Sequence, residues 1–166
     1  MRSLVGSTPT LFRHTCHAEG VDLMAREIFR GAIPAGLFYD TRYDMWVKED
    51  GDELLIGATS LGIFHAGEII AFTAKPAGAE VDKGRGLGTV ECAKTVLAVH
   101  APVSFVLIQG NEEAETKPAL VNRDPYGRGW MVRGRARNWN ADRAALVDAA
   151  AYRRHVLSVE PDAEIE

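Results

Sequence analysis

Lys94 is the side chain in this sequence whose position best suits chemistry. It lies between two runs of strand-forming residues, 88–92 before it and 96–99 after it. This pattern predicts a hairpin with the lysine at its tip. A hairpin tip is the most exposed point of a rigid sheet, so an amine there can enter the active site of another enzyme and be modified. The alternative is a lysine that only solvates a turn, as most surface lysines do.

Several motifs around and after Lys94 occur together in one order. They are Val90-Glu91-Cys92-Ala93-Lys94, Ala101-Pro102-Val103-Ser104, Leu120-Val121-Asn122, Asp124-Pro125-Tyr126-Gly127 and Gly129-Trp130. Together they resemble the lipoyl-lysine hairpin and the downstream signature of the glycine cleavage H-protein family, over about residues 39 to 155. The resemblance implies that Lys94 carries an amide-linked lipoyl group. It also implies that the chain is a carrier of covalently bound lipoic acid rather than an enzyme.

Glu91 lies three residues before Lys94, as a glutamate does in the family. The resemblance suggests that the enzyme attaching the lipoyl group recognises this side chain. The alternative is an ordinary strand carboxylate. No general acid or base is expected on the carrier itself, because the enzymes it visits supply the catalysis.

Cys92 replaces the serine that the family usually has two residues before the lysine. Residues two apart in a strand share a face, so the thiol could meet the base of the arm and exchange with its dithiolane. Such exchange needs a lowered thiol pKa, and the neighbouring Glu91 would have the opposite effect. We therefore interpret Cys92 as a small, half-buried packing residue in preference to a redox partner.

The cargo of the arm is a separate question. In the glycine cleavage branch the arm carries a positively charged aminomethyl group, and carboxylates near the arm help to hold it. Met45 and Ala98 occupy two positions where that branch has acidic residues. An ammonium group is costly to desolvate without such partners, so the sequence disfavours this cargo.

Residues 37–40, 71–73 and 138–139 resemble a second branch with the H-protein fold, the lipoate-binding proteins of heterodisulfide-reductase-like sulfur oxidation. His100 lies where that branch tends to be basic, which would suit an anionic sulfur adduct. Cysteines expected in that branch are replaced by Ala32, Ile63 and Leu87. The sequence thus predicts a carrier in oxidative sulfur metabolism, with glycine cleavage as the alternative.

The partners implied are the lipoate attachment enzyme, dihydrolipoamide dehydrogenase, and either a heterodisulfide-reductase-like complex or the glycine cleavage enzymes. A further alternative is an unmodified H-like module that binds or regulates a partner. It is motivated by Phe105, where the family has a turn glycine, and by Gly110, which interrupts an expected strand.

Composition limits the function classes. The chain has 166 residues and is 46% hydrophobic, enough for one domain with a substantial core. A net charge of -4 argues against nucleic acid as a partner. The arginines at 128, 133, 135 and 137 are interpreted as a solvated strand face or a docking patch for an acidic partner. Two cysteines and no long apolar run predict a cytoplasmic protein without a membrane span.

Two further patterns resemble binding motifs but do not predict a binding site. His14, Cys16 and His17 crowd three potential ligands together, but no second cluster supplies a fourth, so no metal site is predicted. Gly84, Gly86 and Gly88 lead into strand residues rather than a helix, which argues against a phosphate-binding loop.

The body reads as short strands separated by turn residues, at 45–48, 54–59, 69–73, 88–92, 96–99, 103–109 and 130–135. Such spacing is typical of a compact barrel or sandwich. The fold class expected is mainly β, a flattened barrel or sandwich of two antiparallel sheets, and the resemblance implies the lipoyl/biotinyl hybrid-barrel type. Amphipathic helices are predicted at 21–30 and, capped by Asn140, after the sheets. The expected parts are an N-terminal extension (1–36), an H-protein-like lipoyl domain (37–157) and a frayed acidic tail (158–166).

Overall fold

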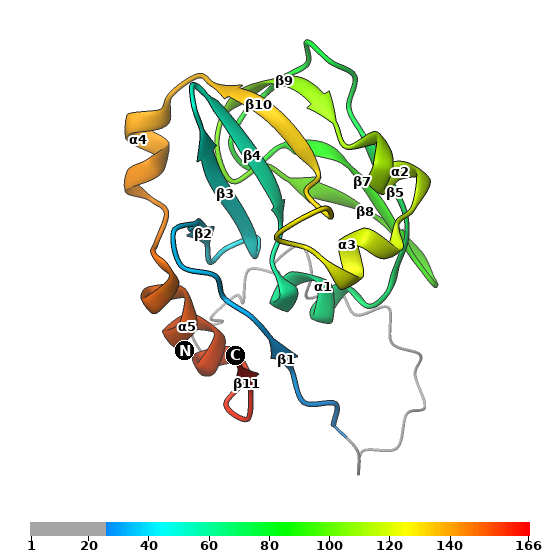
Figure 1. The fold of residues 1–166 in the computed structure, drawn as a ribbon, viewed down its shortest axis with the longest axis vertical. Helices are drawn as coiled ribbons and strands as arrows, with labels where there is room; N and C mark the ends of the chain where they lie inside the picture. Colours follow the sequence, from blue (N-terminus) through cyan, green and yellow to red (C-terminus); the bar gives the residue numbers. More distant parts are fainter. Residues whose placement is uncertain (1–25) are drawn as a thin grey trace, which may run out of the picture.

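The computed structural model describes residues 26–166, so the cluster at residues 14–17 lies outside the described residues. Two antiparallel sheets form the body (Figure 1). The large sheet has the strand order β2 (Phe38–Asp40), β3 (Met45–Asp50), β4 (Glu53–Ala58), β10 (Val132–Ala136), β9 (Phe105–Gly110) and β6 (Glu80–Val81). The small sheet has the order β5 (Ile69–Ala74), β7 (Gly86–Cys92) and β8 (Thr95–His100).

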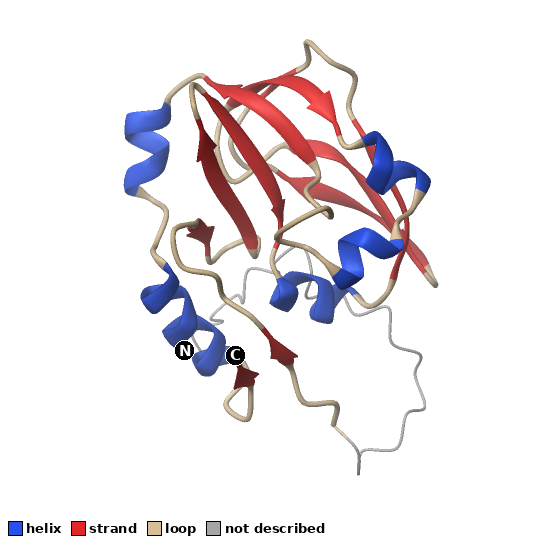
Figure 2. Cartoon of the chain, viewed as in Figure 1, coloured by secondary structure: helices blue, strands red, loops and turns tan. Residues whose placement is uncertain are grey.

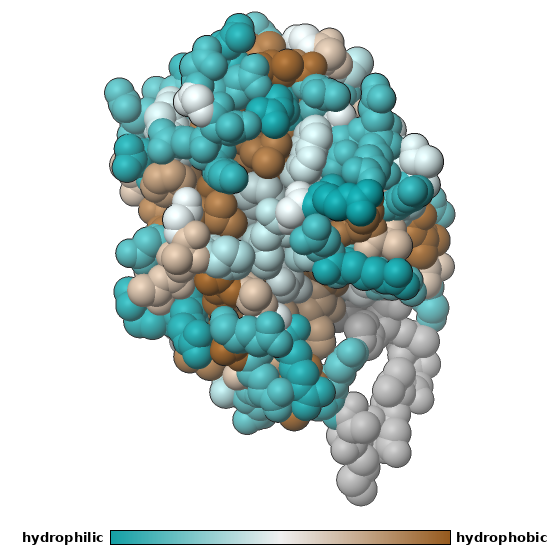
Figure 3. Space-filling view, in the orientation of Figure 1, coloured by the Kyte–Doolittle hydropathy of each residue, from teal (hydrophilic) through white to brown (hydrophobic). Residues whose placement is uncertain are grey.

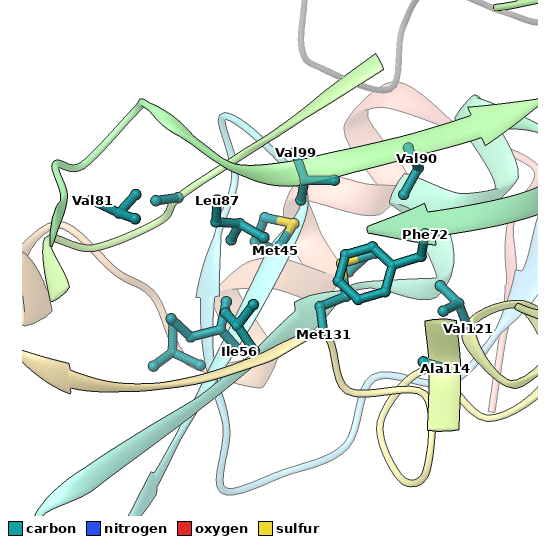
Figure 4. Close-up of a cluster of buried hydrophobic side chains, with 14 of the residues drawn as sticks. Met45, Ile56, Phe72, Val81, Leu87, Val90, Val99, Ala114, Val121 and Met131 are labelled. Carbon is teal, nitrogen blue, oxygen red and sulfur yellow. The ribbon is translucent and has the colours of Figure 1, made fainter. Parts of the chain in front are cut away.

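The main core lies between these two sheets. Strands of both sheets alternate buried and exposed side chains, so each sheet has one apolar inner face. The inner faces bring together Met45, Ile56, Phe72, Leu87, Val90, Val99 and Met131 (Figure 4). Burying each large apolar side chain contributes about 1.5–3 kcal/mol. The predicted two-sheet architecture is confirmed, and the sheets do not close into a barrel.

The helices lie outside the sheets, at their ends and along one side (Figure 2). They are α1 (Ser60–Ala66), α2 (Glu112–Thr116), α3 (Ala119–Arg123), α4 (Trp139–Ala144) and α5 (Ala149–Val159). Side chains fix where three of them begin: Thr59, Asn111 and Asp148 accept hydrogen bonds from the amides of Gly62, Ala114 and Ala151, respectively. No helix of residues 26–166 is long and apolar enough to cross a membrane.

The single helix predicted after the sheets, with Asn140 as its cap, was wrong. The structure has two helices, α4 and α5, and Asn140 lies inside the first of them. Between them Val147 exchanges two backbone hydrogen bonds with Tyr39, at 2.8 and 2.9 Å. Asp148 then begins a new helix. The tertiary pairing with β2 interrupts a pattern that looks continuous in the sequence.

The predicted N-terminal helix and frayed tail were also wrong where the structure describes them. Residues 26–29 are not helical, and β1 (Arg30–Gly31) pairs in parallel with β11 (Glu164–Ile165). An ion pair between Arg30 and Glu164 adds to this pairing. Residues 21–25 of the predicted helix lie outside the described residues.

A second cluster of buried side chains lies where α5 and β1 pack against the outer side of the large sheet. Its members are Phe29, Tyr39, Trp46, Leu61, Tyr152 and Val156, and we call it the second core. Tyr39 and Tyr152 stack with ring centroids 4.6 Å apart. The second core joins residues near both ends of the described chain, because Phe29 from one end and Tyr152 and Val156 from the other are buried in the same cluster.

Candidate functional site

Lys94 lies in the two-residue loop that joins β7 and β8. Cys92 and Thr95 form the last pair of the antiparallel ladder, so Ala93 and Lys94 extend beyond it. Both loop residues are exposed, and Lys94 makes no ion pair or hydrogen bond with any residue in 26–166. The hairpin predicted from the sequence is confirmed. The Lys94 amine is therefore accessible to an approaching enzyme.

The hairpin stands on a packed base. β7 is the middle strand of the small sheet, paired with β5 on one side and β8 on the other. Val90 and Val99 are fully buried in the main core. Gly88 permits the close approach of β5, since a Cβ atom there would stand 2.4 Å from the Thr73 carbonyl oxygen. The loop that carries Lys94 is therefore tied on both sides to strands anchored in the core.

Glu91 and Cys92 lie on opposite faces of the small sheet. Glu91 is exposed on the outer face, opposite Val96, and makes no ion pair with a described residue. Cys92 is on the inner face and only 1% exposed. It is thus more deeply buried than the half-buried side chain that we predicted. Its sulfur does not lie on the outer face, where Glu91 and Val96 are exposed.

His100 lies at the far end of β8 from Lys94, about 20 Å away at ~3.3 Å per residue. Its Nδ1 donates a hydrogen bond of 2.7 Å to the Gly84 carbonyl oxygen. Its ring stacks on Tyr43, with centroids 4.8 Å apart and planes 8° apart. The histidine is therefore fixed at the foot of the hairpin, and its role toward a carried group stays a hypothesis.

The structure separates Met45 from Ala98, the two positions from which the sequence argued against an ammonium cargo. Met45 is 0% exposed and lies in the main core beside Leu87 and Val99 (Figure 4). Ala98 is exposed on the outer face of β8. A carboxylate at position 45 would be buried without a partner in this packing. The use of Met45 as evidence about the cargo was therefore wrong.

The downstream signature residues brace the scaffold. Asn122 on α3 accepts a hydrogen bond of 2.9 Å from the Ile69 amide and donates one of 2.8 Å to the Ile69 carbonyl oxygen. The Trp46 indole donates to the Pro125 carbonyl oxygen at 3.0 Å. The Tyr126 hydroxyl accepts from the first amide of α1 at 3.0 Å. The sequence located these residues correctly without revealing that Asn122 holds β5 while Pro125 and Tyr126 hold β3 and the start of α1.

A buried polar cluster beside the second core was missed by sequence reasoning. The Tyr152 hydroxyl donates to an Asp44 carboxylate oxygen at 2.9 Å and lies 2.8 Å from the Thr59 hydroxyl. Burial, reinforced by the charge of Asp44, raises the pKa of Tyr152 well above its ordinary value. The phenol therefore stays protonated and can donate. Asp44 and Tyr152 are 108 residues apart, so no local pattern links them.

The arginine cluster does not form a free cationic patch. Three of its four members bind carboxylates of the same chain: Arg128 with Glu113, Arg133 with Asp50 and Glu53, and Arg137 with Asp82. Internal pairing of this kind cancels most of the field that an acidic partner would meet. The docking patch considered from the sequence is not supported by this arrangement.

Comparisons of sequence and of structure with known proteins point to one family. A family model described as glycine cleavage H-protein matches residues 37–158. The chain is 37% identical over 127 residues to the glycine cleavage system H protein of Mycolicibacterium vanbaalenii, covering 75% of this chain and 96% of that one. It is 34% identical over 125 residues to the probable glycine cleavage system H protein 2 of Sulfolobus acidocaldarius, covering 74% and 84%. A crystal structure of a glycine cleavage system H protein from Mycobacterium marinum matches with a TM-score of 0.62 at 27% identity, covering 72% and 95%.

An open two-sheet sandwich with an exposed lysine on a hairpin is an arrangement suited to carrying a covalently bound group. The chain belongs to the glycine cleavage H-protein family. H proteins are lipoyl carriers and not catalysts, and their lipoate is attached covalently to a lysine, so lipoate is the cofactor here. The residues present fit the group, because a lysine amine lies exposed in a short loop on a packed base.

Proposed function

We propose that Lys94 carries the lipoyl group and that the chain serves as the mobile carrier of a glycine cleavage system. The observation that carries this proposal is the exposed amine in the two-residue loop between β7 and β8. When bound, the lipoyl group supplies a long arm with a disulfide that can accept and release the carried group. The residues of the chain contribute exposure of the amine, a fixed hairpin base, and surfaces for the enzymes that act on the arm.

Two considerations favour glycine cleavage over oxidative sulfur metabolism. The three relatives described above carry the name of the glycine cleavage system, and none of the three is named for sulfur oxidation. In addition, the buried position of Met45 removes half of the charge argument against an aminomethyl group. The partners proposed are therefore the lipoate attachment enzyme, the glycine cleavage enzymes and dihydrolipoamide dehydrogenase. The heterodisulfide-reductase-like complex predicted from the sequence has no support from these relatives.

Intact-mass measurement tests the attachment site. Protein treated with a lipoate ligase, lipoate and ATP should gain the mass of one lipoyl group, and Lys94→Arg should gain none. Lys75→Arg is the matched control, because Lys75 is also exposed and directly follows β5. An unmodified wild-type chain would instead favour the unmodified binding module.

The carried group needs a separate test. Lipoylated protein incubated with glycine decarboxylase, its cofactor and glycine should gain the mass of an aminomethyl group on the arm. Lipoylated protein without glycine is the control. If the chain is lipoylated yet never loaded, the carrier assignment stands and the glycine cleavage assignment fails.

A further inference from the structure

Three exposed side chains lie together on the outer face of the small sheet, next to the loop that holds Lys94. Glu91 on β7 lies opposite Val96 on β8 and opposite Ala71 on β5, and Ile70 precedes Ala71 at a register shift in β5. Strands in a sheet are ~4.8 Å apart, so these positions span about 10 Å. We call Ile70, Glu91 and Val96 the tip patch.

The tip patch contains more exposed apolar surface than most of the described protein surface. Four large hydrophobic side chains of residues 26–166 are strongly exposed, and Val96 and Ile70 are the most exposed of them, at 61% and 51%. In Figure 3 apolar surface reaches the edge of the molecule where Figure 1 places β5 and the hairpin. Scattered exposed hydrophobic residues are ordinary, whereas two beside a modified residue indicate a contact surface.

The backbone presents Ile70 in a fixed position. Ile69 and Phe72 are both buried although they are three residues apart, because the register shift turns Ile70 and Ala71 outward together. Asn122 holds the backbone of Ile69 through two hydrogen bonds. A contact residue held in this way loses little conformational freedom when a partner binds.

The charge of the tip patch specifies what a partner must offer. Across β5, β7 and β8, Glu91 is the single carboxylate, and these strands contain no lysine or arginine. Glu91 also makes no ion pair with a described residue. A complementary partner would present apolar surface with a cationic side chain opposite Glu91.

We propose that the tip patch is the surface on which the enzyme that acylates Lys94 binds, an inference that rests on the proposed function. In that reaction the Lys94 nitrogen attacks the carboxyl carbon of lipoyl adenylate, made from lipoate and ATP. The amide bond forms, AMP leaves, and the lysine ammonium gives up two protons. This enzyme must bring its active site to the lysine nitrogen itself, so it contacts the adjacent sheet surface. An enzyme that acts on the far end of the arm does not need to reach the lysine nitrogen.

Acylation kinetics on matched variants test the apolar part. The substrate is the apo-protein, with a lipoate ligase, lipoate and ATP. Val96→Thr keeps the β-branched shape but replaces one methyl group with a hydroxyl, and should lower kcat/KM about tenfold, mainly by raising KM. Val96→Ile keeps the apolar surface and should stay near wild type. Ile70→Ser should behave like Val96→Thr.

Leu157→Ser is the distant control, because Leu157 is 40% exposed on α5, away from the small sheet. It should leave kcat/KM unchanged. Thermal unfolding of every variant shows that each is folded at the assay temperature. Wild-type kcat/KM in both Val96→Thr and Ile70→Ser would overturn the inference while leaving the lipoylation of Lys94 intact.

The ionic part has its own measurement. If Glu91 meets a cation on the ligase, kcat/KM for the wild type should fall as salt is raised, and Glu91→Gln should weaken that dependence. An unchanged salt dependence in Glu91→Gln would contradict a cation opposite Glu91. A folded wild-type chain that is never acylated would overturn the inference together with the proposed function.

Discussion

The hairpin tip and the second core differ in whether their side chains have partners within the fold. At the tip, Lys94, Glu91 and Val96 are exposed and make no side-chain hydrogen bond with a described residue. In the second core, Tyr152 is buried, stacked and hydrogen-bonded to a carboxylate. The difference teaches that side chains left without partners by the fold are those available to other molecules. Substitutions should therefore separate the two regions, with loss of stability in one and loss of modification in the other.

The largest expected effect is at Trp46. Its ring is fully buried in the second core, and its indole donates to the Pro125 carbonyl oxygen. Trp46→Ala should lower the free energy of unfolding by about 3–5 kcal/mol, because it leaves a large cavity. Urea denaturation measures the change. Trp139→Ala, at a half-buried ring, should lower the free energy of unfolding by less. Equal decreases for the two variants would contradict a larger stabilising role for the fully buried ring.

Tyr152→Phe removes the hydroxyl that donates to the buried Asp44 carboxylate and leaves His155 Nε2 3.5 Å from the same oxygen. We expect the free energy of unfolding to fall by about 1–3 kcal/mol, with acylation of the folded protein unchanged. Tyr43→Phe is the control, because Tyr43 is only half-buried and its hydroxyl makes no hydrogen bond with a described residue. A slower acylation in Tyr152→Phe would show that the two regions are coupled.

Asp40 offers a pH-dependent test beside the second core. One carboxylate oxygen accepts from the Arg42 amide at 2.8 Å, and the other is buried without a hydrogen bond. Burial raises the pKa of Asp40 above its ordinary value, so folding favours the protonated form. The resulting stabilisation is complete below the unfolded pKa of about 3.9 and is lost as pH rises through the folded pKa.

Asp40→Asn should therefore be as stable as wild type near pH 3 and more stable at pH 7, by up to about 1 kcal/mol. Urea unfolding at the two pH values measures the difference. Asp148→Asn is a control, because Asp148 is exposed at the start of α5 and lacks this burial. Lower stability of Asp40→Asn at pH 7 would mean that the charged form is the stabilising one.

The smallest effect on stability is expected at the tip. Lys94→Arg should change the free energy of unfolding by less than about 0.5 kcal/mol, since the side chain is exposed and makes no contact that the fold requires. The same substitution should abolish lipoylation. A marked loss of stability would show that Lys94 supports the hairpin. It would contradict the view that the tip residues serve modification and the second core serves stability.

The features that the sequence predicted are those encoded locally. Runs of strand-forming residues on either side of Lys94 predicted the hairpin, which needs only residues close in sequence. Features that join distant segments were missed, among them the β1–β11 pair and the contact between Asp44 and Tyr152. Burial of Met45 was missed for the same reason, because alternation along a strand does not reveal which face the other sheet will cover.

The side chain of Asn122 has a consequence for self-association. A strand at a sheet edge offers free amides and carbonyls to any chain that can add to it. Asn122 occupies both backbone groups of Ile69, and Glu115 on α2 accepts from the Ala74 amide at 2.7 Å. The outer edge of β5 is thus blocked at both ends by side chains from two short helices. Among residues 26–166, β8 pairs only with β7, so its uncharged outer edge is where strand addition by a second copy would begin.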